Sequence, residues 1–221
     1  MAKYMIHTCN DRKWYVDKFL VPSMLEQGIK EEDITVYVDK GLGNLQSCMD
    51  SFDLTGDIHC SGIWHLQDDI IISSRFKELT EYYDTSGVVC GYCGTEDPHK
   101  HVCGETTPKQ MWYSFPCVRI PTHISFACSE WYFLFASKNQ EYRMWLEAKK
   151  YDDSFFELYM QEYCHYLTVL NLKPNLVDHI DYLIGGSLIN KIRSEPARSA
   201  YFEEQYLIDN LKKQLDKHYS I

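Results

Sequence analysis

The chain is predicted to be an α/β protein with a mostly parallel central sheet, helices on both faces and a helical C-terminal part. Two observations predict this class. Short β-branched runs alternate with amphipathic segments over the first ninety residues, which is the order of βαβ units. These runs are also almost continuously apolar, as expected for strands covered on both faces. With 221 residues, 45% of them hydrophobic, the chain is predicted to form one domain over residues 1–221.

The first half contains the clearest elements. Strands are expected in the apolar, β-branched runs at residues 3–9, 33–39, 62–67 and 87–92. Helices are expected between them, where apolar residues recur at helical spacing, at residues 14–28, 45–52 and 73–84. Pro22 should kink the first of these helices or restart a turn, and Gly28 should end the helix.

The second half is expected to be more helical. Residues 93–117 show no period and are predicted to form a long loop, a kind that is usually functional or mobile. Helices are then predicted in the amphipathic segments 129–151 and 152–167, and at about 199–217 as the last element. Between them, "KPNLVDHI" is expected to be extended and to lead into the glycine turn 185–187.

Charge and hydropathy exclude some classes of protein. The net charge of −10 and the pI near 5.3 disfavour sequence-independent nucleic-acid binding as the main task, because phosphate neutralisation requires a basic surface. No run approaches the roughly 18 apolar residues of a membrane span, and "MAKYMIHTCN" lacks the apolar centre of a signal peptide. Nine cysteines, an odd number, fit reduced thiols. A cytoplasmic protein is expected.

The segment "GIWHLQDDIIISSRF", residues 62–76, ends an apolar strand on two adjacent acids, Asp68 and Asp69. Carboxylates at the carboxyl edge of a sheet suit Mg²⁺ or Mn²⁺ that bridges phosphates, because such cations take carboxylate and substrate oxygens together. Alternatively, the two acids cap the helix that follows and interact favourably with its dipole.

Several short motifs together resemble glycosyltransferases of the GT-A fold. They are "HTCNDR" after the first strand, Asp39 at the end of the second, "WHLQDDI", "YDDSFF", and "PNLVDHI" followed by "GGSLIN". The resemblance covers roughly residues 3–190. It implies a GT-A-like, Rossmann-like sheet and a nucleotide-sugar donor, for which a UDP-sugar is expected, held by Mn²⁺ or Mg²⁺ at an acidic DxD motif.

The resemblance also implies roles for individual residues. The DxD triplet corresponds to Gln67, Asp68 and Asp69, so that Gln67 replaces the first acid and Asp69 is the expected direct metal ligand, beside Asp68. His179 corresponds to a late histidine that ligates the same cation, and a neutral imidazole is a competent ligand for Mn²⁺. The alternative is that His179 is a core residue with satisfied hydrogen bonds.

Nucleoside and acceptor contacts follow from the same resemblance. Asp39 corresponds to the nucleoside contact, and His7, Thr8 and Arg12 lie at the exit of the first strand, along which a nucleotide would pass. A single histidine at such a place is more often packed or solvated than a ligand contact. Asp153, with Asp152 beside it, is similar to the catalytic base of inverting members, which takes the proton of the acceptor hydroxyl. Asp39 could instead be a surface loop acid, and the acidic pair could be an ordinary helix cap.

A separate group could bind zinc. It consists of residues of zinc-ligating types at CxxC and HxHxC spacing, namely Cys90, Cys93, His99, His101 and Cys103. The spacing matches no structural zinc pattern, and Cys90 belongs to an apolar strand. The segment 93–117 is more consistent with a cover over the site, with Trp112 and Tyr113 as surfaces on which a sugar stacks.

The sequence therefore predicts a metal-assisted, inverting glycosyltransferase that moves a sugar from a nucleotide diphosphate to a hydroxyl on a glycan, a protein or a hydroxylated DNA base. The acidic charge disfavours the nucleic-acid acceptor. Two alternatives remain. A nucleotidyltransferase would carry a glycine-rich basic signature near the first strand, which "HTCNDRKW" lacks. A binding or scaffold protein with a degraded site is consistent with Gln67.

Overall fold

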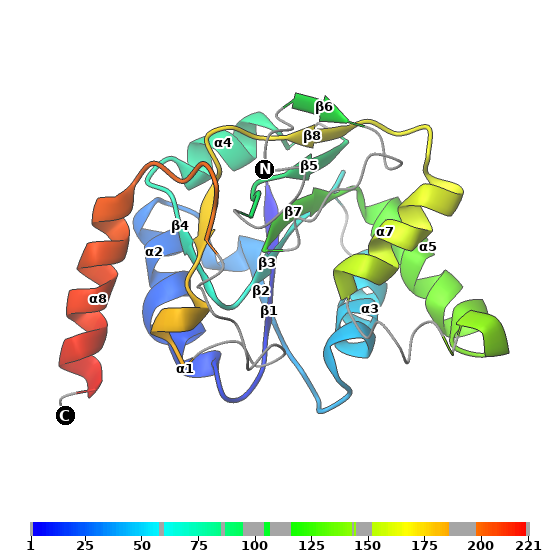
Figure 1. Cartoon of the computed structure of the whole chain (residues 1–221), viewed down its shortest axis with the longest axis horizontal. Helices are drawn as coiled ribbons and strands as arrows, with labels where there is room; N and C mark the ends of the chain where they lie inside the picture. Colours follow the sequence, from blue (N-terminus) through cyan, green and yellow to red (C-terminus); the bar gives the residue numbers. More distant parts are fainter. Residues whose placement is uncertain are drawn as a thin grey trace.

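The computed structural model describes residues 2–57, 60–84, 87–94, 104–106, 116–142, 144, 152–185 and 198–219. At its centre is a seven-stranded sheet in the order β2-β1-β3-β7-β5-β8-β6 (Figure 1). The strands are β1 (Lys3–Thr8), β2 (Ile34–Val38), β3 (Ile63–Gln67), β5 (Val88–Cys90), β6 (Gly104–Thr106), β7 (Cys117–Ile120) and β8 (Val169–Asn171).

The predicted α/β class is confirmed, and the sheet is mixed but largely parallel. β1 pairs in parallel with both β2 and β3, and β5 pairs in parallel with β8. β7 lies antiparallel between β3 and β5, and β6 lies antiparallel at the edge beside β8. Strands β2, β1, β3, β5 and β8 therefore point the same way, whereas β7 and β6 run against them.

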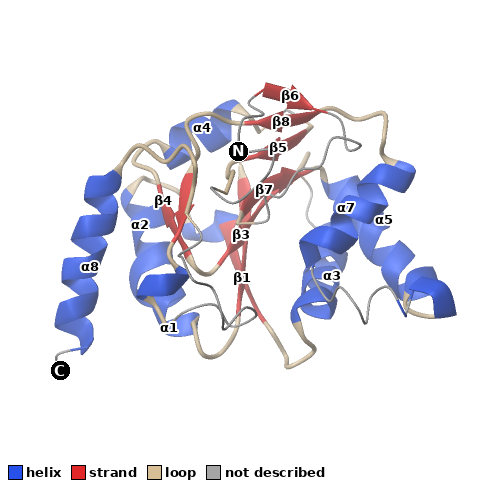
Figure 2. Ribbon diagram, in the orientation of Figure 1, coloured by secondary structure: helices blue, strands red, loops and turns tan. Residues whose placement is uncertain are grey.

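Helices cover both faces of the sheet (Figure 2). One face carries α1 (Lys13–Tyr15), a π-helical turn (Val16–Leu20), α2 (Val21–Glu26) and α8 (Gln205–Tyr219). The opposite face carries α3 (Asn44–Leu54), α5 (Thr122–Trp131), which continues as a π-helical turn (Tyr132–Ala136), and α7 (Asp152–Tyr163). The described residues also include α4 (Phe76–Tyr82) and single 3₁₀ turns at Glu31–Asp33, Thr55–Asp57 and Asp181–Leu183.

Alternating side chains of the inner strands build the two cores. On β1, Tyr4 and Ile6 join Trp64 and Leu66 of β3 in the core beneath α1, α2 and α8. Met5, between them, packs with Ile63 on the other side. A second large core lies among α3, α5 and α7. The period of two along each strand thus divides buried side chains between two helical layers.

The first predicted helix is correct in position but not in form. The single helix expected at residues 14–28 is an α-helical turn, a π-helical turn and α2 in succession. Pro22 lies at the start of α2, where its missing N–H removes an intrahelical hydrogen bond. Gly28 has φ of 80° and follows the helix, as predicted for a C-terminal stop.

The structure contains a second sheet of two strands, of which the sequence predicted only one. β4 (Ile70–Ile72) pairs antiparallel with β9 (Val177–His179), and Ile70 lies opposite His179. The extended segment predicted around residues 173–180 supplies β9, whereas β4 is an unpredicted strand inside the segment assigned to the acidic edge. This pairing brings residues more than one hundred positions apart in the sequence to the carboxyl end of β3.

The last helix begins later than predicted. It starts at Gln205 rather than near residue 199, because residues 199–204 form an irregular segment that is hydrogen-bonded to other parts of the chain. Ala200 N donates to Cys93 O at 2.7 Å, and Glu204 accepts a hydrogen bond from Ser74 N at 2.6 Å, just before α4. The start of the segment 129–151, predicted as one broken helix or two, lies in helical structure that begins earlier, because α5 starts at Thr122. Residues 143 and 145–151 lie outside the described residues. Strand β6 lies inside the predicted loop 93–117, much of which falls outside the described residues.

Candidate functional site

The carboxyl ends of β1 and β3 form a topological switch point. From β1 the chain passes through α1 and α2 on one face to reach β2, and from β2 it passes through α3 on the opposite face to reach β3 (Figure 1). Connections that diverge in this way open a crevice outside the ends of the two strands, which is where ligands bind in open α/β sheets. Arg12 follows β1, and Asp68 and Asp69 follow β3 at this edge.

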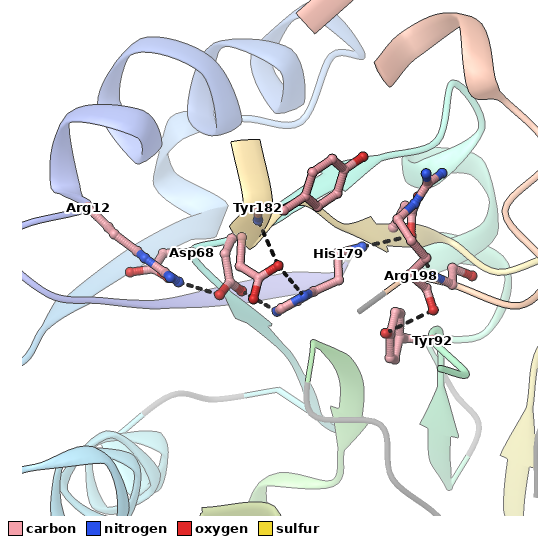
Figure 3. A network of polar contacts seen from close by, with 10 residues as sticks. Arg12, Asp68, Tyr92, His179, Tyr182 and Arg198 are labelled. Atoms are coloured by element: carbon pink, nitrogen blue, oxygen red, sulfur yellow. Dashed lines mark hydrogen bonds and ion pairs between the residues drawn. The ribbon is translucent and has the colours of Figure 1, made fainter. Parts of the chain in front are cut away.

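Arg12 joins the two acids. Its Nη1 donates to Asp68 Oδ1 at 3.1 Å and also to Asp69 Oδ2 (Figure 3). The backbone N–H of Cys9 donates to Asp68 Oδ2 at 3.3 Å. Arg12 is only 5% exposed and each aspartate 7%. A buried guanidinium thus lies against two buried carboxylates, each of which would be costly to bury alone.

His179 extends this arrangement from the other side. Its Nε2 lies 3.1 Å from Asp69 Oδ1, and its Nδ1 lies 3.4 Å from Asp181 Oδ1 (Figure 3). The β4–β9 pairing fixes the imidazole here, because Ile180 N donates to Asp69 O at 2.8 Å. Arg12, Asp68, Asp69, His179 and Asp181 are called the charged cluster below.

The cluster shifts the proton affinities of its members in opposite directions. Burial and the neighbouring Asp69 carboxylate raise the pKa of Asp68, although Arg12 opposes this. Burial opposes ionisation of Asp69 as well, but His179 and Arg12 outweigh it and hold the pKa of Asp69 well below its usual range. Burial alone would lower the pKa of His179, but Asp69 and Asp181 outweigh it and raise the pKa to about 10. Both His179 and Arg12 are therefore cations facing Asp69 at neutral pH.

The charged cluster does not fit a divalent cation in this arrangement. Asp69 and Asp181 contact opposite nitrogens of the His179 ring, so that the three side chains form a chain and do not converge on one point. Arg12 already donates to both carboxylates of the acid pair. Among the residues that the structure describes, no group of three His, Cys, Asp or Glu side chains could hold a metal ion. The expected metal ligands Asp69 and His179 are thus brought together, but as an ion pair.

Asp39, the predicted nucleoside contact, lies at the end of β2 on the same edge of the sheet. Its Oδ1 accepts hydrogen bonds from Gly41 N at 2.9 Å, Leu42 N at 3.0 Å and the Ser47 hydroxyl. Burial is the largest single influence and opposes ionisation, but the hydrogen bond from Ser47 and those from the loop amides together outweigh it and lower the pKa of Asp39. Asp39 is therefore an ionised carboxylate that orders the loop before α3.

Of the other predicted site residues, two lie at this edge of the sheet and two lie at the start of α7. Thr8 is buried at the end of β1, and its side chain favours the ionised form of Asp68. Gln67 ends β3, half-buried, with its backbone N–H bonded to Pro116 O at 3.2 Å. Asp152 and Asp153, the predicted base and its neighbour, are the first residues of α7. Their side chains lie outside the description, so their role stays a prediction.

The predicted cysteine and histidine group is only partly within the described residues. Cys90 and Cys93 are buried, at the end of β5 and just after it. His99, His101 and Cys103 lie outside the described residues, as do Trp112 and Tyr113. Gly185 of the predicted glycine turn has φ of 109°, a conformation that favours glycine. The zinc alternative and the covering role of this segment stay predictions.

Sequence reasoning missed a hydrogen-bonded group next to His179. Arg198 Nε donates to Asp178 Oδ2 at 2.6 Å, and Tyr92 OH donates to Arg198 O at 3.3 Å (Figure 3). Asp178 is fully buried, and it also accepts a hydrogen bond from its neighbour His179 N at 2.9 Å. The acidic pattern "VDHID" carried the signal, because a buried strand with two acids around a histidine requires cationic or N–H partners.

On the α3 face of the same strands, His7 pairs with His65, a partner that the sequence did not predict. His7 Nε2 lies 3.0 Å from His65 Nδ1, and Ser51 Oγ lies 3.2 Å from His7 Nδ1. The His65 ring packs against Phe52 with centroids 4.7 Å apart. Burial lowers the pKa of His7 to about 4, and burial followed by the charge of His7 lowers the pKa of His65. Both rings are therefore neutral at pH 7.

Comparisons with known proteins identify no family. No family model matches the chain, and no curated protein matches it. Solved structures with a distant similarity include the following three. Protein A197 from STIV has 11% identity over 80% of this chain and 85% of its own, with a TM-score of 0.40. A protein assigned as a glucose-1-phosphate thymidylyltransferase from Bacillus anthracis, in complex with a sucrose, has 12% identity over 78% and 87%, with a TM-score of 0.43.

The third structure is HddC from Yersinia pseudotuberculosis, with 8% identity over 57% of this chain and 80% of its own, and a TM-score of 0.33. Such remote likenesses assign no activity to this chain. None of the helices within the described residues is long and apolar enough to cross a membrane.

Proposed function

We propose that the chain is a glycosyltransferase that moves a sugar from a nucleoside diphosphate to a hydroxyl acceptor. One observation carries this proposal: a buried arginine and an acid pair occupy the switch point at the ends of β1 and β3. A nucleotide bound in this crevice would present its phosphates to the loop after β1 and its nucleoside to the end of β2.

The residues at this edge suit the parts of such a donor. A guanidinium matches the geometry of phosphate oxygens and keeps its charge at every physiological pH, which makes Arg12 the group to meet the diphosphate. Asp39 is an ionised acceptor at the end of β2, suited to ribose or base hydrogen-bond donors. Thr8, the last residue of β1, lies beside Asp39, since it pairs with Val38 and its carbonyl accepts a hydrogen bond from Asp39 N at 2.7 Å.

The proposed reaction is a displacement at the anomeric carbon of the sugar. The acceptor oxygen forms a bond to this carbon while the bond from the carbon to the diphosphate oxygen breaks, and the nucleoside diphosphate leaves with the bonding electrons. A carboxylate takes the acceptor proton, and Asp153, with Asp152 beside it, is proposed for this step. Arg12 offsets negative charge that develops on the leaving diphosphate.

Calorimetric titration tests the donor site. Purified protein is titrated with UDP, GDP and their common sugar conjugates, with and without Mn²⁺. We expect one nucleotide to bind. Asp39→Asn should lower the affinity for this nucleotide by about tenfold or more, as expected when a hydrogen bond to a charged group is lost. Asp53→Asn, at an exposed acid of α3, is the matched control. If no nucleoside diphosphate binds under either condition, the proposed function fails.

Product analysis then separates the alternatives. Release of free nucleoside diphosphate from a nucleotide sugar supports the glycosyltransferase, whereas pyrophosphate from a nucleoside triphosphate and a sugar phosphate would identify a nucleotidyltransferase. Binding without turnover of any acceptor class would instead favour a binding or scaffold protein.

A further inference from the structure

The acid pair after β3 faces cations that belong to the protein itself. Asp68 Oδ1 and Asp69 Oδ2 accept hydrogen bonds from the same nitrogen, Arg12 Nη1. Asp69 Oδ1 faces His179 Nε2 at 3.1 Å, and Asp68 Oδ2 faces Cys9 N at 3.3 Å. Each of the four carboxylate oxygens thus has a donor or cation beside it. Mg²⁺ or Mn²⁺ would need at least one of these oxygens, together with further oxygen or nitrogen ligands.

Displacing these partners would be costly. The Arg12 side chain is only 6% exposed and those of Asp68 and Asp69 are 10% and 11% exposed. If a metal ion took the acids, the guanidinium would lose its counter-ions in a buried place or would have to leave it. Gln67 adds to this, since it supplies a neutral amide where the DxD pattern has its first acid.

From this geometry we propose that Arg12 and His179 occupy the carboxylate oxygens of Asp68 and Asp69 that a divalent cation would need, so that the site binds a diphosphate through Arg12 without a metal. The diphosphate part rests on the proposed function, whereas the exclusion of metal from the acid pair does not. The acids act as counter-ions that hold Arg12 at the end of β1. Because Asp68 and Asp69 share one guanidinium nitrogen, the phosphate can replace the Asp68 contact while Asp69 retains its own.

The test measures metal and nucleotide separately. The wild-type protein is titrated with Mn²⁺ alone, followed by electron paramagnetic resonance of the free ion, and then with UDP and GDP in EDTA and in Mn²⁺. We expect no Mn²⁺ bound at the acid pair, and an affinity for the nucleotide that differs less than about twofold between EDTA and Mn²⁺. Stoichiometric Mn²⁺ binding that Asp69→Asn removes would overturn the proposal, as would nucleotide binding that requires the metal.

Variants at Arg12 sharpen the test. Arg12→Gln should free the acids, so that Mn²⁺ binding appears while metal-free nucleotide affinity falls by roughly ten- to hundredfold. The control is Lys13→Gln, at a neighbouring surface lysine that pairs with Asp17. It should change neither Mn²⁺ binding nor nucleotide affinity. If Arg12→Gln does not fold, Arg12→Lys keeps the charge but loses the planar fork, and it should weaken the nucleotide without creating a metal site. Unchanged nucleotide affinity in both Arg12 variants would contradict the role of the guanidinium.

The two proposals fail in different ways. Absence of any nucleotide binding removes the proposed function, while the Mn²⁺ titration alone still decides whether the acid pair is closed to metal. Nucleotide binding that depends on Mn²⁺ retains the glycosyltransferase proposal and overturns the metal-free site.

Discussion

Strands β1 and β3 carry two groups of buried ionisable side chains that accommodate burial in opposite ways. The charged cluster beyond their carboxyl ends keeps its members ionised, because Asp69 lies between the cations Arg12 and His179. The histidine pair, earlier on the same strands and on the α3 face, stays neutral. His7 and His65 face each other and Ser51, and burial rather than a carboxylate of the described residues sets their pKa values. The protonation of a buried group thus depends on its neighbours more than on its depth.

This difference has a functional consequence. A cluster of paired charges can exchange one partner for a ligand of the same sign, such as a phosphate in place of a carboxylate. A neutral pair packed against Phe52 offers no such exchange, and we assign it to the packing between the sheet and α3. The predictions below test the two groups against each other.

The largest effect is expected for Arg12→Ala. This substitution leaves Asp68 and Asp69 as adjacent buried carboxylates, and breaking a buried ion pair in this way costs about 3–5 kcal/mol. Urea unfolding followed by circular dichroism measures the free energy of unfolding. Lys13→Ala removes an exposed pair and should cost less than about 1 kcal/mol. A loss of similar size in both variants would show that the charged cluster is not a buried network.

The histidine pair should give an intermediate effect that depends on pH. The pKa of His7 is lower in the folded chain than the ordinary 6.5, so the unfolded chain binds more protons between pH 6.5 and about 4. Stability contributed by the neutral ring is therefore complete above pH 6.5 and is lost as the pH falls toward 4. The slope is at most about 1.4 kcal/mol per pH unit for each histidine.

The comparison of wild type with His65→Leu isolates this slope. Replacing His65 removes the buried imidazole, so the variant should lose less stability between pH 6.5 and 4.5 than the wild type. His123→Leu, at an exposed histidine of α5, is the control and should follow the wild type. Parallel stability curves for wild type and His65→Leu would refute the assignment of the acid sensitivity to this pair.

The smallest effect is expected for Tyr15→Phe, which removes one neutral hydrogen bond beneath the charged cluster. The Tyr15 hydroxyl donates to Ile70 O at 2.8 Å, directly after the acid pair. Its loss should lower the free energy of unfolding by about 1 kcal/mol. Nucleotide affinity should change little, because Arg12 keeps both carboxylates. A larger effect on nucleotide affinity than on stability would mean that Tyr15 positions the acids for binding.

Much of the parallel half of the sheet could be read from the sequence. The strands around residues 3–9, 33–39, 62–67 and 87–92 are near-continuous apolar runs, and each corresponds to a strand of the sheet. Because the carboxyl ends of parallel strands share an edge, the position of Asp39, Asp68 and Asp69 near one another also followed from local sequence. β4, β6, β7 and β8 have only three or four residues each, too few to show a period, and they were missed. β5 is equally short, but it lies within the longer apolar run 87–92.

The sequence by itself determined the residue types available at the switch point: a strand that ends on two acids, an arginine after the first strand and a late histidine. Only the tertiary structure decided that these residues neutralise one another. The pairing of β4 with β9 sets His179 against Asp69, and the path after β1 sets Arg12 against both acids. A carboxylate favours any cation within reach, and which cation reaches it is fixed by long-range packing that local sequence patterns do not encode.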